Sequence, residues 1–482
     1  MPIQESGRAL FMNVLFVHNN FPAQFRHLVT RLARNSTVKM AAIGSRTAAA
    51  FQGVRPIKYA LHGADLAETH PFARRFDMEC RRAEQVLYGL SNLVTSGFRP
   101  DVIFAHPGWG ETLPLRTIFP EARFLLYCEY YYGAREGDLG FDPEFPMSGL
   151  DGHVAVRLKN ATTLLALADC DLGISPTTWQ RATFPAHYQA KIEVAHDGID
   201  CALARPDAEA VVSLPSGRRL KASDEVVTYV ARNLEPLRGY HIFMRALPRI
   251  LAQRPNAEVV ILGGDGTSYG AAAPAETTWK SLFLREVKSR IDRRRVHFLG
   301  RVSYETYLRV LQVSTAHVYL TYPFVLSWSM LEAMSAGCVV IGSDTPPVRE
   351  MIDGNNGILV PFFDIEQLSN RVVDVLENRE RYRPMREAAR QFVTANFDAD
   401  TICVPRLMQL LQVESGSRKT RPKEATDPEI QPIKHSKTKL PPNKTELPPN
   451  EWTPGIRSES GEVSNGKTSP SVVYGGIQAK RR

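Results

Sequence analysis

The chain has 482 residues, too many for one typical domain and enough for two of ordinary size with extra segments. Hydrophobic residues make up 43%, sufficient for substantial cores, and no run of about eighteen apolar residues predicts a membrane-spanning helix. The first residues, MPIQESGRALF, lack the basic and apolar regions of a secretory signal. Six scattered cysteines without metal-ligand spacing are typical of reduced cytosolic thiols, which argues against a disulfide framework or a zinc site.

The formal net charge of +8 would on its own suggest a nucleic acid or an anionic membrane as partner. Residues 414–482, however, carry 13 Lys and Arg against 8 Asp and Glu, so this tail holds +5 and the rest of the chain only +3. The tail is rich in Pro, Ser, Lys and Glu and has no apolar periodicity, which predicts disorder. We therefore expect no nucleic-acid partner, and a solvated tail is favoured over a membrane or partner tether.

The first half of the body alternates strand-like and helical patterns. Strands are predicted at 13–17, 38–43, 102–105, 123–127 and 171–175, and helices at 71–93 and 152–168. Such alternation predicts a parallel, doubly wound α/β sheet. The first strand is followed by the loop HNNFPAQF (18–25), whose polar side chains suit contacts with sugar or acceptor hydroxyls; helix capping by Asn20 is the alternative interpretation.

The second half repeats this alternation after a loose stretch at about 200–224. Strands are predicted at 226–231, 258–263, 296–299 and 338–342, with helices up to 252, around 278–293 and, with breaks, over 364–412. The predicted organisation is an N-terminal extension, a first Rossmann-like domain for the acceptor, a linker, a second Rossmann-like domain for a nucleotide-sugar donor, a terminal helix crossing back, and the tail. Their bounds are 1–12, 13–204, 205–224, 225–396, 397–413 and 414–482.

The densest group of motifs lies between residues 322 and 360. Ser327 and Ser329 are natural helix-start residues, and Glu332 follows in the opening turns. A helix start carries free N–H groups and partial positive charge, which suits phosphate and sugar hydroxyls. Gly337 ends the helix before a buried strand, so this helix start lies where nucleotide sites form in open α/β sheets.

This segment resembles the donor-binding motif of retaining glycosyltransferases of family 4, which adopt the two-domain GT-B fold. The matching pieces are 331–334, 336–337, Ser343, Asp344, Glu350 and 357–360. The resemblance implies that Glu332 contacts the ribose hydroxyls of a nucleotide-diphospho-sugar, while Ser327, Ser329 and neighbouring amides meet phosphate or sugar. The family places another glutamate eight residues earlier, near the sugar; here that position is Phe324, so the first glutamate of Glu-x7-Glu is absent.

The same resemblance implies three further site residues. Arg232 matches the family's arginine at the first loop of the donor domain, and Arg238 stands, one position displaced, for the following lysine; both would bind the diphosphate. A solvated surface pair is the alternative. His106, just past a predicted strand and followed by small residues, would reach the donor sugar from the opposite wall of a cleft; a purely structural histidine is the alternative.

Two Asp-x-Asp triplets, at 169–171 and 398–400, lie at a helix-to-strand junction and before the last helix, and are not interpreted as magnesium sites. We expect no catalytic metal and no cofactor beyond the donor substrate. Arg232, Arg238 and the helix start would instead neutralise the leaving diphosphate.

The resemblance thus implies a retaining, hexosyltransferase-type enzyme that transfers sugar to a saccharide or lipid-linked acceptor in polysaccharide or glycoconjugate biosynthesis. Its expected location is cytoplasmic, with peripheral association to the inner membrane face left open. The main alternative is a catalytically inactive nucleotide-sugar-binding or assembly protein, which Phe324 supports. A sugar-nucleotide epimerase on the same fold would need an acid/base carboxylate pair, and none is evident.

Overall fold

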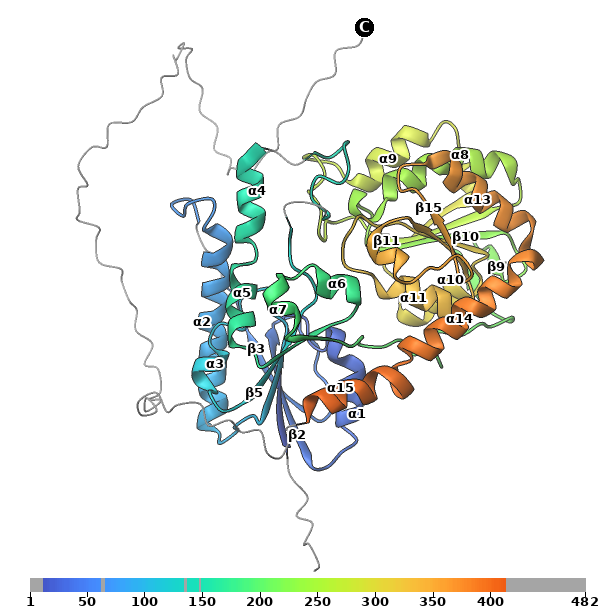
Figure 1. Ribbon diagram of the computed structural model, residues 1–482. Helices are drawn as coiled ribbons and strands as arrows, with labels where there is room; N and C mark the ends of the chain where they lie inside the picture. The colour runs from blue at the N-terminus through green and yellow to red at the C-terminus, as the bar shows by residue number, and fades with distance from the viewer. Residues whose placement is uncertain (1–11, 62–65, 134–136, 147–148, 413–482) are drawn as a thin grey trace, which may run out of the picture. The chain divides into compact units, whose positions relative to one another are not determined.

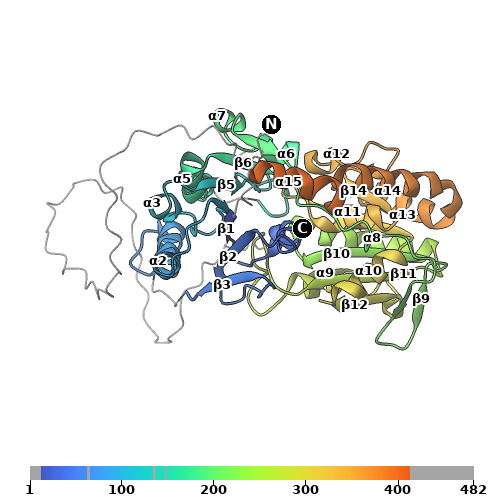
Figure 2. The same ribbon diagram turned by 90° about the horizontal axis from the view of Figure 1, so that it is seen from below.

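The computed structural model describes residues 12–61, 66–133, 137–146 and 149–412, all within one compact unit. The predicted N-terminal extension, apart from its last residue, and the predicted tail at 414–482 lie outside the described residues. Within them, two parallel sheets are each covered by helices on both faces, as Figures 1 and 2 show from two directions.

The first sheet, in the described residues, has seven strands in the order β3-β2-β1-β4-β5-β6-β7, all parallel. The strands are β1 (Met12–Val17), β2 (Val38–Ser45), β3 (Val54–Tyr59), β4 (Val102–Ala105), β5 (Arg123–Tyr127), β6 (Leu172–Ser175) and β7 (Ile192–Val194). Its helical elements are η1 (Ala23–Phe25), α1 (Arg26–Leu32), α2 (Arg74–Thr95), α3 (Leu115–Ile118), α4 (Gly149–Leu158), α5 (Ala161–Asp169), α6 (Thr178–Ala182) and α7 (Ala186–Gln189).

The second sheet, again counting only described residues, has six parallel strands in the order β12-β11-β10-β13-β14-β15. They are β10 (Val226–Asn233), β11 (Glu258–Gly264), β12 (Val296–Gly300), β13 (Ala316–Tyr319), β14 (Val339–Ser343) and β15 (Ile358–Val360). The helical elements are η2 (Pro236–Arg238), α8 (Tyr240–Gln253), α9 (Trp279–Val287), η3 (Arg293–Arg295), α10 (Tyr304–Gln312), α11 (Trp328–Ser335), α12 (Pro346–Arg349), α13 (Ile365–Glu377), η4 (Arg379–Tyr382) and α14 (Arg383–Phe397).

Both sheets have the strand order of doubly wound nucleotide-binding domains, with the topological switch beside the first strand of each sheet. All nine predicted strands are therefore confirmed, with ends shifted by at most two residues. Four strands of the two sheets were missed: the edge strands β3, β7 and β15, and the inner strand β13, whose four residues include the polar His317. β3 contains Pro56 between two basic residues, a composition that only an edge strand tolerates, and β7 is three residues long.

The helix predicted over 152–168 is two helices, α4 and α5. They are separated by Lys159 and Asn160. The buried Asn160 amide donates to the carbonyl of Tyr132 at 2.8 Å and accepts from its N–H at 2.9 Å. The Asn160 side chain thus bonds the backbone N–H and C=O of Tyr132, as a neighbouring strand would. Because these hydrogen bonds satisfy a buried polar group, they fix the position of the break between α4 and α5.

The stretch predicted to be a loose linker is partly ordered, which corrects that prediction. A hairpin of β8 (Val211–Ser213) and β9 (Arg219–Lys221) lies within it. Val212 and Leu220 are buried against residues of β10 and β11, so the hairpin belongs to the second domain's core. Its alternating pattern was masked by the flanking Pro and Gly residues, which are natural in the hairpin turn.

The chain passes from one domain to the other twice, and backbone hydrogen bonds join the two passages. Ile199 N donates to Phe397 O and Ala399 N to Ile199 O, both at 2.8 Å, forming a parallel bridge. After a π-helical turn, Ala399–Cys403, α15 (Val404–Leu411) packs with buried residues of α1 and β1. Figure 1 shows α14 and α15, in orange, running from the second sheet to the first.

Glu350, at the end of α12, joins the second domain to the first. Its carboxylate accepts the backbone N–H of Thr178 at 2.7 Å and that of Trp179 at 2.8 Å, at the start of α6. Hydrogen bonds to a charged acceptor contribute about 1.5–3 kcal/mol. We expect Glu350→Ala to lower the free energy of unfolding by about 2 kcal/mol in urea denaturation. Glu366→Ala, at a carboxylate with a single exposed ion pair, is the control and should change it by less than about 1 kcal/mol.

Candidate functional site

Arg238 lies buried at the end of η2, beyond the carboxyl end of β10. Its Nη1 donates to Thr321 Oγ1 at 2.8 Å and to Val325 O at 3.0 Å. Its guanidinium carbon stands 5.7 Å from the Phe324 ring centroid and 5.8 Å from that of Tyr269. Within the described residues no carboxylate lies at ion-pair distance from it. Its hydrogen-bond partners among the described residues are neutral, and its charge also acts to lower the pKa of the buried Asp138 carboxyl group. The guanidinium group is thus buried without a direct carboxylate partner in the described residues, which suits an anionic ligand.

Arg232 is exposed near the end of β10, and its Nη1 donates to the hydroxyl of Tyr269 at 3.4 Å. Burial raises the pKa of Tyr269, while the charges of Arg232 and Arg238 act to lower it. Arg232 thus donates to the Tyr269 hydroxyl while Arg238 lies over the Tyr269 ring, so both arginines stand beside one tyrosine.

The predicted helix start at Ser327 is confirmed as the N-cap of α11. Ser327 Oγ accepts the N–H of Ser329, and the N–H of Ser327 donates to the hydroxyl of Tyr319 at 2.8 Å. Arg238 Nη1 also reaches the Tyr319 hydroxyl, at 3.5 Å. Ser327, Ser329 and the Arg238 side chain are thus brought together at one edge of the second sheet.

Glu332, one turn into α11, is held by two tyrosines of α10. Tyr304 Oη donates to Glu332 Oε1 at 2.8 Å and Tyr307 Oη to Oε2 at 2.6 Å. Burial raises the pKa of Glu332, and the hydrogen bonds from Tyr307 and Tyr304 offset part of that effect. Two hydroxyls on this carboxylate show that it accepts a pair of O–H donors, the same chemistry that a ribose diol presents. A carboxylate also has lone pairs for further donors.

The buried ring of Phe324 lies between the two domains, beside Arg238. Its ring centroid lies 4.9 Å from that of Tyr130, on the first domain, and 5.0 Å from that of Tyr269. Tyr130 Oη also donates to Pro323 O at 3.2 Å. An aromatic contact between the two domains therefore lies beside Arg238, at the position eight residues before Glu332.

His106 follows β4 directly, as expected, and is buried at the carboxyl edge of the first sheet. Gly108 N donates to its Nδ1 at 3.0 Å, and its Nε2 faces Glu129 Oε2 at 3.3 Å. The ring stacks on Trp109 with centroids 4.7 Å apart. His106 is thus oriented by its neighbours, and its free polar edge is directed to Glu129.

His18, at the carboxyl end of β1, packs edge-on against His106, with ring centroids 5.0 Å apart. Burial lowers the pKa of His18 well below its usual value, and the charges of His106 and Arg232 act in the same direction. His18 is therefore neutral at physiological pH. Tyr130, which follows β5, packs against Phe324, which follows β13, so the carboxyl edges of the two sheets face each other. Asn20 provides no side-chain cap for the following helical turn.

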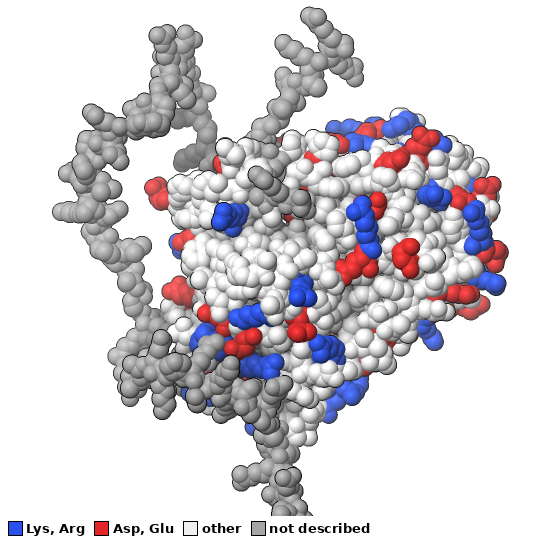
Figure 3. Space-filling model, in the orientation of Figure 1, with Lys and Arg blue, Asp and Glu red and all other residues white. Residues whose placement is uncertain are grey.

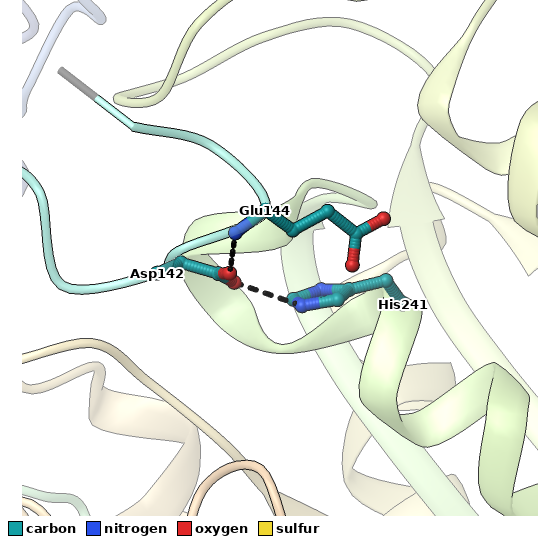
Figure 4. Close-up of side chains that lie close together, drawn as sticks. All are labelled: Asp142, Glu144 and His241. Atoms are coloured by element: carbon teal, nitrogen blue, oxygen red, sulfur yellow. Dashed lines mark hydrogen bonds and ion pairs between the residues drawn. The ribbon is translucent and has the colours of Figure 1, made fainter. Parts of the chain in front are cut away.

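Asp142, Glu144 and His241 form a cluster of metal-ligand types, drawn in Figure 4. Asp142 Oδ2 lies 2.9 Å from His241 Nε2 and accepts the hydroxyl of Tyr322 at 2.6 Å. Arg245 binds both oxygens of Glu144, at 2.7 and 2.8 Å. Because both carboxylates are already paired with donors, the cluster is an ionic clasp between a first-domain loop and α8 rather than a cation site.

Sequence reasoning missed Glu129, Asp142, His241 and the two tyrosines of Glu332. A signal existed for Glu129, which comes two residues after a correctly predicted strand. The tyrosines stand three apart on a helix, but nothing local shows that they reach a carboxylate 25 and 28 residues away.

The charged side chains on the face shown in Figure 3 are mixed in sign over the second domain. Among the described residues, no helix combines the length and the apolar composition needed to cross a membrane.

Solved structures share this arrangement of two facing sheets. Sucrose-phosphate synthase from Thermosynechococcus elongatus superposes with a TM-score of 0.63 at 18% identity, covering 83% of this chain and 98% of that one. Anabaena HepE, solved in complex with UDP-glucose, gives 0.55 at 16% identity, covering 83% of this chain and 100% of that one. The fold is GT-B, the two-domain architecture of glycosyltransferases.

Family models match both domains. Residues 36–204 match the "Glycosyl transferase family 4 group" and residues 216–392 match "Glycosyl transferases group 1". The chain belongs to glycosyltransferase family 4, as the motif between 322 and 360 had indicated.

The curated relatives match this chain over only part of their length. Glycogen synthase of Mycobacterium tuberculosis is 26% identical over 235 residues, 48% of this chain and 51% of that protein. The chain therefore spans about half the length of the first relatives that it matches. The GDP-mannose-dependent α-(1-6)-phosphatidylinositol monomannoside mannosyltransferase of the same species is 24% identical over 329 residues, 64% of this chain and 76% of that protein.

Proposed function

We propose that this protein is a retaining glycosyltransferase that moves a hexose from a nucleotide-diphospho-sugar to a saccharide or lipid-linked acceptor. The observation that carries the proposal is Arg238, a buried cation whose hydrogen-bond partners in the described residues are neutral and which lies beside a serine-capped helix start. Relatives include a glycogen synthase and a GDP-mannose-dependent mannosyltransferase, which supports a hexose donor and either class of acceptor. Polysaccharide or glycoconjugate synthesis is the setting that the names of these relatives favour.

Loss of the diphosphate is the main chemical demand of such a transfer. As the bond between the sugar C1 and the phosphate oxygen breaks, negative charge grows on the diphosphate. Arg238, fixed by Thr321 and Val325, and the nearby Arg232 would stabilise that charge without reorganising. This mechanism uses no metal ion and no cofactor besides the donor, and His106 would face the sugar from the first domain.

The direct test combines binding with turnover. Thermal shift with UDP-glucose and GDP-mannose should show stabilisation by about 2.7 kcal/mol at one hundred times the dissociation constant. Hydrolysis of the same donors without an acceptor should then be detectable. No stabilisation and no hydrolysis with either donor would contradict the proposal.

The second candidate is a nucleotide-sugar-binding or assembly protein that has lost catalysis. Phe324 favours it, because a buried ring replaces the family's sugar-side glutamate. Stabilisation by a donor without hydrolysis or transfer would select this candidate.

Glu332 provides a separate prediction about the ribose. Glu332→Gln should weaken donor binding by about 10-fold or more, because a charged acceptor is lost, while the folded structure persists. Tyr304→Phe is the matched control: it removes one hydroxyl from the carboxylate and leaves the carboxylate itself available. Isothermal titration with the donor measures both. Equal affinity of wild type and Glu332→Gln would remove this residue from the site.

A further inference from the structure

Glu129 is a carboxylate of the first domain that the proposed function does not use. It lies two residues beyond β5, at the carboxyl edge of the first sheet. Gln24 Nε2 donates to its Oε1 at 2.7 Å, and His106 Nε2 lies 3.3 Å from its Oε2. Its side chain nevertheless keeps 26% of its exposure. The carboxylate is therefore fixed in direction and still accessible to a ligand.

The surroundings of Glu129 keep it ionised. Burial acts to raise its pKa, but the hydrogen bond and charge of His106, the hydrogen bond from Gln24 and the charge of Arg232 together lower the pKa below its usual value. The hydrogen bond from Gly108 N to His106 Nδ1 orients the ring so that Nε2 faces Glu129. A negative charge is thus maintained here at neutral pH.

The groups opposite Glu129 belong to the second domain. Its charge acts on the Tyr269 hydroxyl, which also feels Arg232 and Arg238. Tyr130, the next residue, packs against Phe324, and Gln180 Nε2 fixes the Glu129 carbonyl at 2.6 Å. Arg232 donates to the Tyr269 hydroxyl and Arg238 lies over the Tyr269 ring, so two guanidinium groups of the second domain stand beside the residue on which the charge of Glu129 acts.

We propose that Glu129 contacts the donor sugar and stabilises the positive charge that develops on it, the role left open by Phe324. The inference rests on the proposed function. When the bond from C1 to the phosphate oxygen breaks, its electron pair leaves with the diphosphate and positive charge spreads over C1 and the ring oxygen. The acceptor oxygen then bonds to C1, and the acceptor proton passes to an oxygen of the departing diphosphate. A carboxylate facing two guanidinium groups matches this separation of charge.

The test uses the full chain and whichever of UDP-glucose and GDP-mannose the wild-type protein hydrolyses. Glu129→Gln should lower kcat by about 100-fold, while the donor dissociation constant changes less than about threefold. Glu129→Asp, which keeps the charge on a shorter side chain, should retain more turnover than Glu129→Gln. Formate should restore part of the turnover of Glu129→Ala. Glu193→Gln, at an exposed carboxylate of β7 paired with Arg406, is the control and should match wild type.

Two results would overturn the inference: turnover of Glu129→Gln within threefold of wild type, or equal turnover in the Gln and Asp variants. A loss seen only in donor affinity, without formate rescue, would assign Glu129 to orienting His106 and would also overturn it. Circular dichroism melting reports whether each variant is folded. If the Gln variant is not folded, the turnover of the Asp variant and the formate rescue of the Ala variant decide the question. Absence of hydrolysis by the wild type would instead count against the proposed function.

Discussion

Arg238→Ala is expected to lower turnover by about 100- to 1,000-fold, corresponding to about 2.7–4 kcal/mol of transition-state stabilisation. The reason is that this buried guanidinium has only neutral hydrogen-bond partners among the described residues, so its charge is available to the leaving diphosphate. Steady-state hydrolysis of the donor at fixed salt measures the effect. Arg249→Ala, at an exposed arginine of α8 paired with Glu366, is the matched control and should retain wild-type turnover.

Arg232 and Arg238 are expected to act on the same charge. The double alanine variant should therefore lose less turnover than the sum of the two single effects in free-energy terms. Near-wild-type turnover in Arg238→Ala, with donor hydrolysis established for the wild type, would falsify the diphosphate assignment. Small additive effects below about 1 kcal/mol on stability alone would place both residues in a surface role.

Asp142→Ala is expected to lower the free energy of unfolding by about 3–5 kcal/mol, because removing one partner leaves the buried His241 and the Tyr322 hydroxyl without an acceptor. Urea denaturation measures this. Asp265→Ala, at a half-exposed carboxylate paired with Lys280, is the control and should change stability by less than about 1 kcal/mol. An effect of Asp142→Ala as small as the control would show that the clasp contributes nothing.

The same carboxylate predicts a pH dependence. Burial acts to raise the pKa of Asp142, but hydrogen bonds from His241, Tyr322 and the Glu144 amide lower it below its usual value. A carboxyl group with a depressed pKa contributes stability above its unfolded pKa of about 3.9 and loses that contribution as the pH falls through its folded pKa. The stability difference between wild type and Asp142→Asn should therefore shrink below about pH 3.9.

The two sheets could be predicted from sequence because their inner strands are continuous apolar runs. In parallel sheets covered on both faces such runs are required, so the pattern is strong and local. β3 and the β8–β9 hairpin were missed because edge positions tolerate charge, Pro and Gly, and their burial depends on distant neighbours. Ser327 was predicted as a cap because capping is decided within three residues.

The site was less predictable, because its contacts join segments far apart in sequence. Arg238 could be assigned to phosphate from its motif, but its neutral environment depends on Thr321 and Val325, 83 and 87 residues away. Glu129 came after a predicted strand, yet its orientation by Gln24 and His106 arises only when β1, β4 and β5 lie side by side. The local sequence pattern therefore indicated which residue types belong to the site, whereas the order of the strands in the sheet determined how their side chains are placed.

The bridge between Ile199 and Asp398 has a mechanical consequence. Since both passages of the chain are hydrogen-bonded to each other there, the two domains are connected through one joined pair of segments rather than two separate ones. Gly198 has a φ of +97°, and a Cβ added to it would lie 2.7 Å from Ala399 Cα. A side chain at position 198 would therefore have to push the two passages of the chain apart, so glycine is required where they meet.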